Sequence, residues 1–370
     1  MKRFAALVSV SLLLALMVIA LGAYTRLTDA GLGCPDWPGC YGKLTAPLHD
    51  EHIAEAQAQF PAANIEPHKA HNEMLHRYIA GLLGLCVLAI VLVSQWLKKC
   101  RWLTGVILLL VIFQAALGMW TVTLNLLPLV VLAHLLGGFA LFSLLALLRM
   151  EIAQHIKTAD IALIKANEKK YGEPALGSLL PLGYLAVLVL VLQIALGGWT
   201  SSNYAAAVCY QLPICEAGWS ERFSLQSAFN LPLGHDTYEY GVLPYEARIS
   251  IHVLHRLGAM ITLLVLGSFA FLSWRRAVTV TMRRLAASIG GLLLLQLTLG
   301  LVNIIAQLPL LNAVAHNLVA ANLLMLTLVF VRQIHLHRTV PKKKHGIEKM
   351  PGLEKNPTIK NVRENRLMTD

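Results

Sequence analysis

Four histidines lie inside long apolar segments of this 370-residue chain, where ionisable side chains are rare. They form two pairs, His76 with His134 in the first half and His255 with His316 in the second. In each pair the imidazoles lie on different predicted helices at a similar depth, about 10 Å below the outer helix end. Two imidazoles on facing helices can ligate a haem iron from both sides. A single histidine could instead make an interhelical hydrogen bond, but two matched pairs favour two haem sites.

An arginine directly follows one histidine of each pair: Arg77 follows His76, and Arg256 follows His255. A haem carries two propionates, and the guanidinium group binds carboxylates through paired hydrogen bonds. The sequence therefore predicts that Arg77 and Arg256 bind propionates. The alternative is that each arginine extends along the helix to a lipid phosphate.

The two histidine sites differ at one neighbouring position. Glu73 precedes His76 by three residues and shares its helix face, whereas the corresponding residue 179 positions later is His252. A carboxylate can transfer protons or stabilise a developing positive charge, so Glu73 is the candidate catalytic residue. The second site, with His252 and His255, is more typical of a resident cofactor. The alternative for Glu73 is an acid at the membrane interface.

Two cysteine pairs, Cys34 with Cys40 and Cys209 with Cys215, have identical spacing around a proline. Both pairs fall in predicted extracytoplasmic loops, where disulfides persist, so we predict the disulfides Cys34–Cys40 and Cys209–Cys215. A metal site is the weaker alternative, because neither loop contains a second closely spaced cysteine pair. Cys86 and Cys100 have no recurring partner and are predicted to be free thiols.

The elements that position these residues are long apolar segments. The mean hydropathy is +0.61, and only 14% of residues are charged, which excludes an ordinary soluble domain. A membrane-spanning helix needs about 20 residues, and eight segments satisfy this: 4–23, 73–97, 102–122, 128–149, 179–198, 249–273, 284–305 and 309–332. We expect the first to be a retained helix, because it is longer than a typical signal-peptide core and has a counterpart in the second half. The predicted fold is an all-α polytopic membrane protein.

The first half of the chain recurs in the second half. Cys34 and Cys40 recur after 175 residues, the pair His76-Arg77 after 179, and His134 after 182. This pattern indicates a duplicated unit and predicts two tandem, pseudo-symmetric four-helix bundles, residues 1–150 and 179–335. A polar cytoplasmic connector is expected at 151–178, and a disordered basic cytoplasmic tail at 336–370.

Lys and Arg collect on one side of the eight predicted spans, which predicts that both termini are cytoplasmic. These residues are Lys2, Arg3, Lys98, Lys99, Arg101, Arg149, Arg275, Arg276, Arg283, Arg284 and Lys342 to Lys344. The net charge of +11 therefore reflects membrane topology and attraction to the lipid bilayer. No basic face is interleaved with aromatic residues, so we expect no nucleic-acid partner.

The segment from Gly22 to Cys40, GAYTRLTDAGLGCPDWPGC, resembles the first-loop signature of haem A synthases. The motifs EMLHR at 73–77, VLHR at 253–256 and AHN at 315–317, together with His134, are also similar to that family. The resemblance covers nearly all of residues 1–335. This chain departs from the simplest family pattern in its long loop 203–247 and in His252, which could compete as a ligand.

The resemblance implies an oxidoreductase of the bacterial inner membrane that oxidises the C8 methyl of haem O to a formyl group. The product, haem A, is required for cytochrome oxidase assembly. It implies that a resident haem b lies between His255 and His316, that the substrate haem O lies between His76 and His134, and that Glu73 takes part in catalysis. Haem O would come from a haem O synthase. The sequence contains no flavin, nicotinamide or iron–sulfur motif, so electrons must come from a partner. Homo-oligomerisation stays open.

Two other classes of function are compatible with histidines inside membrane spans. A bis-histidine membrane cytochrome would only transfer electrons and would leave Glu73 without a role. A transporter built from repeats could use the histidines as a proton relay, but four spans per unit give both halves the same topology rather than the inverted repeats common in transporters. Haem A synthase is the favoured interpretation, with the cytochrome second and the transporter third.

Overall fold

The computed structural model describes residues 1–163, 174–231 and 233–338. The middle of the predicted connector and almost all of the predicted tail lie outside the described residues. The described residues form eight long helices: α1 (Lys2–Leu27), α3 (Pro67–Leu97), α4 (Arg101–Thr123), α5 (Pro128–Leu163), α7 (Leu180–Ser202), α10 (Tyr245–Arg276), α11 (Val280–Ile305) and α12 (Leu310–Arg338). Each has a segment apolar and long enough to span a bilayer. The chain is thus an all-helical multi-pass membrane protein, as its hydropathy predicts, because helices satisfy their own backbone hydrogen bonds in lipid.

Several helices are longer than the predicted apolar spans. Helix α3 begins at Pro67 and α10 at Tyr245, and α5 continues to Leu163, into the predicted connector 151–178. In α5, Ile152 is fully buried beyond the predicted end of its span. Good helix formers such as Glu, Ala and Gln prolong the helix after hydropathy falls, so a hydropathy limit marks the apolar part and not the helix end.

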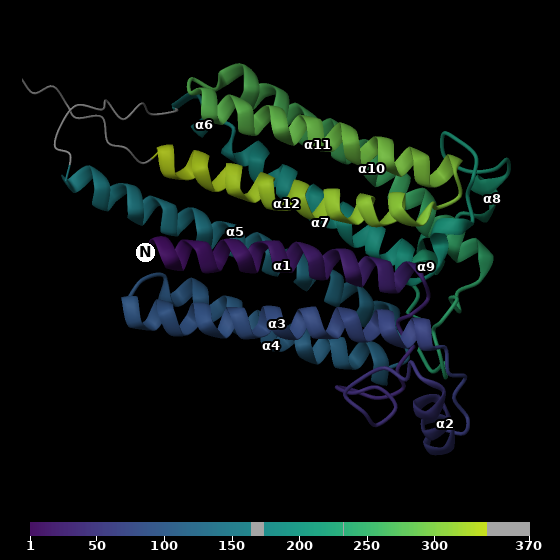
Figure 1. The fold of residues 1–370 in the computed structure, drawn as a ribbon. Helices are drawn as coiled ribbons and strands as arrows, with labels where there is room; N and C mark the ends of the chain where they lie inside the picture. Colours follow the sequence, from purple (N-terminus) through teal and green to yellow (C-terminus); the bar gives the residue numbers. More distant parts are fainter. Residues whose placement is uncertain (164–173, 232, 339–370) are drawn as a thin grey trace, which may run out of the picture. The chain divides into compact units, whose positions relative to one another are not determined.

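The same order of contacts recurs along the two halves of the chain. In the first half α1 packs on α3, α3 on α4 and α4 on α5; in the second, α7 packs on α10, α10 on α11 and α11 on α12. Helices α5 and α12 also contact each other and join the halves. Figure 1 shows α1, α3 and α4 side by side, with α12 and α7 between α1 and the pair α10 and α11. The shared core includes Phe269 and Phe330, whose ring centres are 5.7 Å apart.

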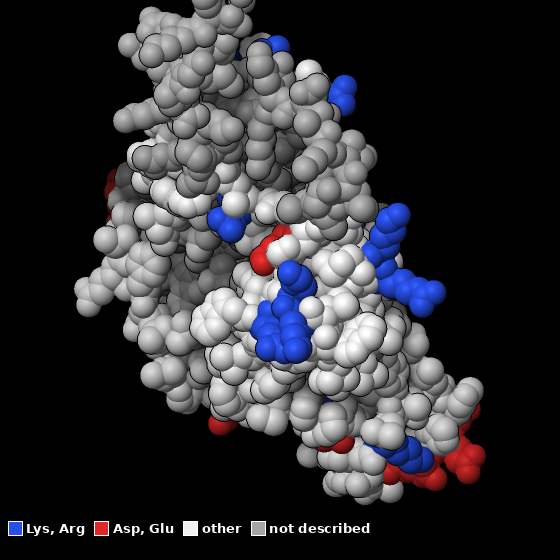
Figure 2. Space-filling view, turned by 90° about the vertical axis from the view of Figure 1, so that its left-hand side faces the viewer, with Lys and Arg blue, Asp and Glu red and all other residues white. Residues whose placement is uncertain are grey.

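The long connecting loops gather at one end of the helices, which we call the loop end. It holds residues 28–66 and 203–244, with α2 (Asp50–Gln59), the 3-10 helix η1 (Ala205–Ala207), α8 (Trp219–Arg222) and α9 (Leu225–Ala228). Figure 1 places α2, α8 and α9 there and the N-terminus at the other end. Figure 2 views this other end, with Lys and Arg side chains in several blue patches on its described part. The short α6 (Pro174–Gly177) lies just before α7.

Candidate functional site

The first predicted histidine pair comes together between two helices. His76 on α3 and His134 on α5 have ring centres 6.4 Å apart, with ring planes at 78°. A metal ion held between two imidazoles separates the ring centres by about 6 Å, because each metal–nitrogen bond is about 2 Å long. The Nδ1 atoms of both rings are buried without a hydrogen-bond partner. The pair therefore fits an iron that is ligated on both sides.

Glycines make room for all four imidazoles. A Cβ built on Gly22 would lie 3.0 Å from Cε1 of His76, and one on Gly197 would lie 3.0 Å from Cε1 of His255. Gly118 and Gly300 stand in the same relation to His134 and His316, at 3.5 and 3.3 Å. Because Gly22 and Gly197 are 175 residues apart, and Gly118 and Gly300 are 182 apart, the close approach is repeated with the duplicated unit.

The second histidine pair, on α10 and α12, has glutamine neighbours. Gln193 on α7 lies with Nε2 3.1 Å from Nδ1 of His255, and Gln296 on α11 lies with Nε2 3.1 Å from Nε2 of His316. The amide oxygens of both glutamines are buried without a partner. Gln296 has a counterpart in the first half, Gln114, 182 residues earlier, whereas the residue 175 positions before Gln193 is Val18 and not a glutamine.

Both arginines bind the cysteine loops, which neither sequence interpretation anticipated. Arg77 Nη1 donates to the carbonyls of Asp36 (2.9 Å) and Gly39 (2.5 Å). Arg256 donates to the carbonyls at the equivalent positions, Gln211 (2.5 Å) and Ile214 (2.6 Å). Each guanidinium thus fixes a loop on its helix. Arg256 Nε remains buried without a partner.

Glu73 is buried and points towards the first cysteine loop. Its Oε2 accepts a hydrogen bond from the Cys34 backbone N–H at 2.8 Å, and its Oε1 pairs with Nη2 of Arg77. His252, its counterpart on α10, is equally buried, and its Nδ1 has no hydrogen-bond partner. The difference between Glu73 and His252 in the repeat therefore gives the two sites different polar groups next to similar cysteine loops.

Both predicted disulfides are formed in the structure. Cys34–Cys40 has an S–S distance of 2.05 Å, and Cys209–Cys215 has one of 2.01 Å. Cys34 and Cys40 belong to a small buried cluster with Met74 of α3. Although Glu216 lies near the second pair, both sulfurs there are bonded to each other and not free as metal ligands. Cys86 and Cys100 are free thiols, as predicted.

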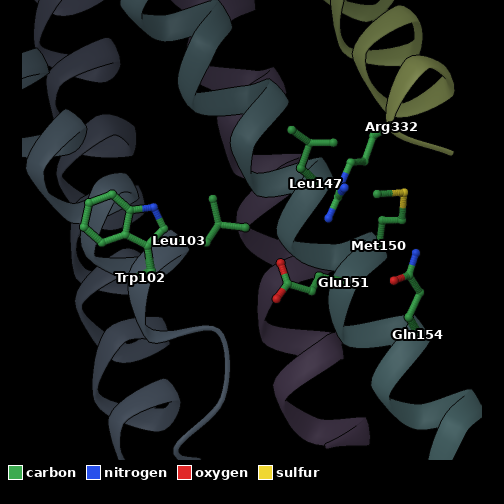
Figure 3. A pocket seen from close by; sticks show the side chains of 7 residues that line it. All are labelled: Trp102, Leu103, Leu147, Met150, Glu151, Gln154 and Arg332. Carbon is green, nitrogen blue, oxygen red and sulfur yellow. The ribbon is translucent and has the colours of Figure 1, made fainter. Parts of the chain in front are cut away.

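Among the described residues, two of the cavities lie away from the histidines. One, of about 240 Å³, lies between α4, α5 and α12 and is lined by Trp102, Leu103, Leu147, Met150, Glu151, Gln154 and Arg332. Figure 3 shows Arg332 reaching from α12 towards the α5 side chains Leu147 and Met150. The other, of about 310 Å³, lies between α10 and α11 and has an apolar lining that includes Phe271 and Trp274.

Beside the first cavity, ligand atoms of Cys100, Glu151 and His155 lie within 4.8 Å of one another. Burial raises the pKa of the Cys100 thiol to about 12, and the Glu151 carboxylate contributes to the rise through its charge and a hydrogen bond. The thiol is therefore protonated near neutral pH.

Comparison with known proteins gives consistent matches. The model of a family described as cytochrome oxidase assembly protein, COX15-CtaA, matches residues 5–328. A haem A synthase of Shewanella oneidensis is 46% identical over 335 residues, which cover 90% of this chain and 97% of that protein. Haem A synthases of Rhizorhabdus wittichii and Rickettsia prowazekii are 26% and 23% identical, over 85% of this chain in both cases and over 89% and 93% of those proteins.

Proposed function

The chain belongs to the COX15-CtaA family of cytochrome oxidase assembly proteins, and on this premise we propose that it oxidises haem O to haem A. The observation that carries the proposal is the His76–His134 pair, whose 6.4 Å separation suits an iron held between the rings. In this proposal the C8 methyl of haem O becomes a formyl group through successive hydroxylations, a four-electron oxidation whose electrons pass to dioxygen or to an external electron acceptor.

The two histidine pairs take different roles in this proposal. His76 and His134 hold the substrate, and His255 and His316 hold a resident haem b in the second half. The support for this division is Glu73 on α3, whose counterpart on α10 is His252 and not an acid. Haem b supplies one-electron transfer when bound, and its electrons come from a partner that the sequence does not identify.

Glu73 is proposed to act on the substrate as a carboxylate of fixed orientation. The Cys34 N–H and the Arg77 guanidinium hold it by charge-assisted hydrogen bonds, which limits its rotation. A carboxylate in this position can accept a proton from water or stabilise positive charge that develops on the substrate. His252 cannot supply a negative charge at the corresponding place.

Arg77 and Arg256 are proposed to support haem binding in two ways: they hold the cysteine loops in place, and they bind haem propionates. By fixing residues 34–40 and 209–215 they keep the two cysteine loops over the histidine sites. The unpartnered Nε–H of Arg256 leaves one donor for a haem propionate.

The proposed orientation puts the loop end outside the cytoplasm. The other end carries Lys2, Arg3, Lys98 and Lys99, and Arg275 and Arg276 lie in the last turn of α10 there. The positive-inside tendency favours the cytoplasm for this end. The disulfides then lie on the oxidising side of the bacterial inner membrane.

Extraction of haems from cells that express the chain beside a haem O synthase tests the proposal. Chromatography with mass spectrometry should detect haem A, and His76→Ala should abolish it while haem b stays bound. If only haem B and unchanged haem O are found even when a reductant is supplied, the chain is an electron-transfer cytochrome instead.

A further inference from the structure

The side-chain nitrogen of Gln193 on α7 contacts two atoms of His255. Its Nε2 donates to the His255 backbone carbonyl at 2.9 Å and lies 3.1 Å from the ring nitrogen Nδ1. The amide therefore bridges the backbone and the imidazole of the same residue. Such a contact restricts both the position and the rotation of the ring.

Space for this amide depends on Gly258, one turn along α10. A Cβ on Gly258 would lie only 2.2 Å from Oε1 of Gln193, so a larger residue there would displace the amide. Gln193 and Gly258 thus form a matched pair: the side chain on α7 occupies the space that the glycine leaves on α10.

The first half replaces both members of this pair. The residue 175 positions before Gln193 is Val18, and the residue 179 positions before Gly258 is Ile79. Val18 has no polar side-chain atom. Nδ1 of His76 is buried without a partner. The side-chain amide is therefore specific to the second half.

A metal-bound imidazole uses one nitrogen for the metal and donates its other N–H to an acceptor, which fixes the ring and increases its basicity. The Oε1 atom of Gln193 is buried without a partner. Rotation of the amide by half a turn would bring this oxygen to Nδ1, where it could accept the N–H of an imidazole whose Nε2 binds iron; the rotation gives up the hydrogen bond from Nε2 to the His255 backbone carbonyl, so the amide must also shift away from that carbonyl oxygen.

We propose that Gln193 is a positioning residue that holds His255 as a ligand of the resident haem, and that Val18 and Ile79 leave His76 without this support. The inference rests on the proposed function and deepens it. It accounts for why one site retains its haem while the other exchanges it: the ligand of the first site has no side-chain hydrogen bond that keeps it in place.

Gln193→Met tests this, because methionine is similar in length but accepts no comparable hydrogen bond. With purified full-length protein, we expect haem b to transfer to apomyoglobin about 10- to 100-fold faster than from the unmodified chain. The reduction potential should also rise, because a less basic ligand stabilises ferric iron less. Gln193→Glu should restore slow loss and lower the potential. Gln95→Met, at an exposed position on α3, should leave both values unchanged.

Unchanged haem loss in Gln193→Met would overturn the proposal. Faster haem loss with an unchanged reduction potential would also overturn the proposal, because it would indicate that Gln193 only packs against His255 and forms no hydrogen bond to the ligand. The proposed function is tested separately by His255→Ala: if that variant keeps its haem b, the site assignment itself fails. If His255→Ala loses haem b and Gln193→Met does not, only the role of Gln193 fails.

The reverse exchange gives an independent test. Val18→Gln with Ile79→Gly installs the pair in the first half, and we expect the double variant to release bound haem O about 10-fold more slowly. Val18→Gln alone should not do so, because Ile79 occupies the required space. Equal release from the double variant and the unmodified chain would overturn the proposal.

Discussion

The guanidinium of Arg26 donates a hydrogen bond to the backbone carbonyl of Ser201 at 2.6 Å, and these residues occupy equivalent positions of the repeat, 175 residues apart. Asp29 and Tyr204 are also 175 residues apart, and the Tyr204 hydroxyl donates to Asp29 at 3.0 Å. Arg26 lies over the Tyr204 ring, 4.0 Å from its centre. Equivalent residues that contact each other mark the place where the two copies of the unit meet.

Arg26→Gln should weaken this junction. We expect a loss of about 1.5–3 kcal/mol from the hydrogen bond of a charged donor, partly offset by exposure to water. Tyr204→Phe, which removes a single hydroxyl, should cost about 1 kcal/mol. Thermal unfolding in detergent measures both, and Arg222→Gln, on the exposed α8, serves as the control. If Arg26→Gln and Arg222→Gln melted alike, the junction would contribute nothing to stability.

Gly197→Ala should disturb the resident haem site. The new Cβ would lie 3.0 Å from the His255 ring, so the imidazole must move by a few tenths of an ångström. Such overpacking costs about 1–3 kcal/mol, and we expect an absorption spectrum with reduced haem b content. Gly81→Ala is the matched control, because nothing lies within 4 Å of its Cβ. Equal haem content in both variants would contradict the predicted approach of α7 to the ligand.

Glu73→Gln should separate catalysis from haem retention. The glutamine amide oxygen can still accept a hydrogen bond from the Cys34 N–H, so the loop should keep its position. Because the negative charge of the Glu73 carboxylate opposite Arg77 is lost, conversion of haem O should fall about 100-fold or more. The haem b content should match that of the unmodified chain. Haem extraction measures both quantities, and a fully active variant would restore Glu73 to a purely structural role.

The loop cysteines should react with thiol reagents only after reduction. Labelling of intact cells with an impermeant maleimide tests this and the orientation together, because both disulfides are proposed to face outwards. Replacing Cys34 and Cys40 by serine should also cost about 2 kcal/mol for so short a ring. Labelling without prior reduction would contradict the disulfides in cells.

Cys100 should react slowly with maleimide near neutral pH. Burial and then Glu151 raise its pKa to about 12, above the ordinary value of 9.0, so the thiolate fraction at pH 8 falls about 1,000-fold. Because the thiolate reacts, the rate should rise about tenfold per pH unit below pH 12. Glu151→Gln should lower the pKa and accelerate labelling. A Cys86→Ser background leaves Cys100 as the free thiol to be followed; a rate independent of Glu151 would contradict the predicted contact.

Local patterns in the sequence predicted the eight helices and indicated the candidate site residues. Hydropathy located the eight spans, because lipid permits few backbone structures other than helices. The short separation of Cys34 and Cys40 allowed the prediction that a disulfide closes a small ring. The repeat offsets paired His76 with His255 and exposed the difference between Glu73 and His252. These features depend on residue type and on separation along one chain segment.

Only the tertiary structure decided where the long polar side chains point. Arg77 reaches loop carbonyls, Gln193 reaches His255, and Arg26 reaches Ser201, across 38 to 175 residues of sequence. An arginine or glutamine side chain has many rotamers and several potential acceptors within reach, so its partner depends on which backbone groups the packed helices leave unsatisfied. The hydrogen-bond partner therefore depends on contacts between helices that are distant in sequence, and no local sequence pattern determines it.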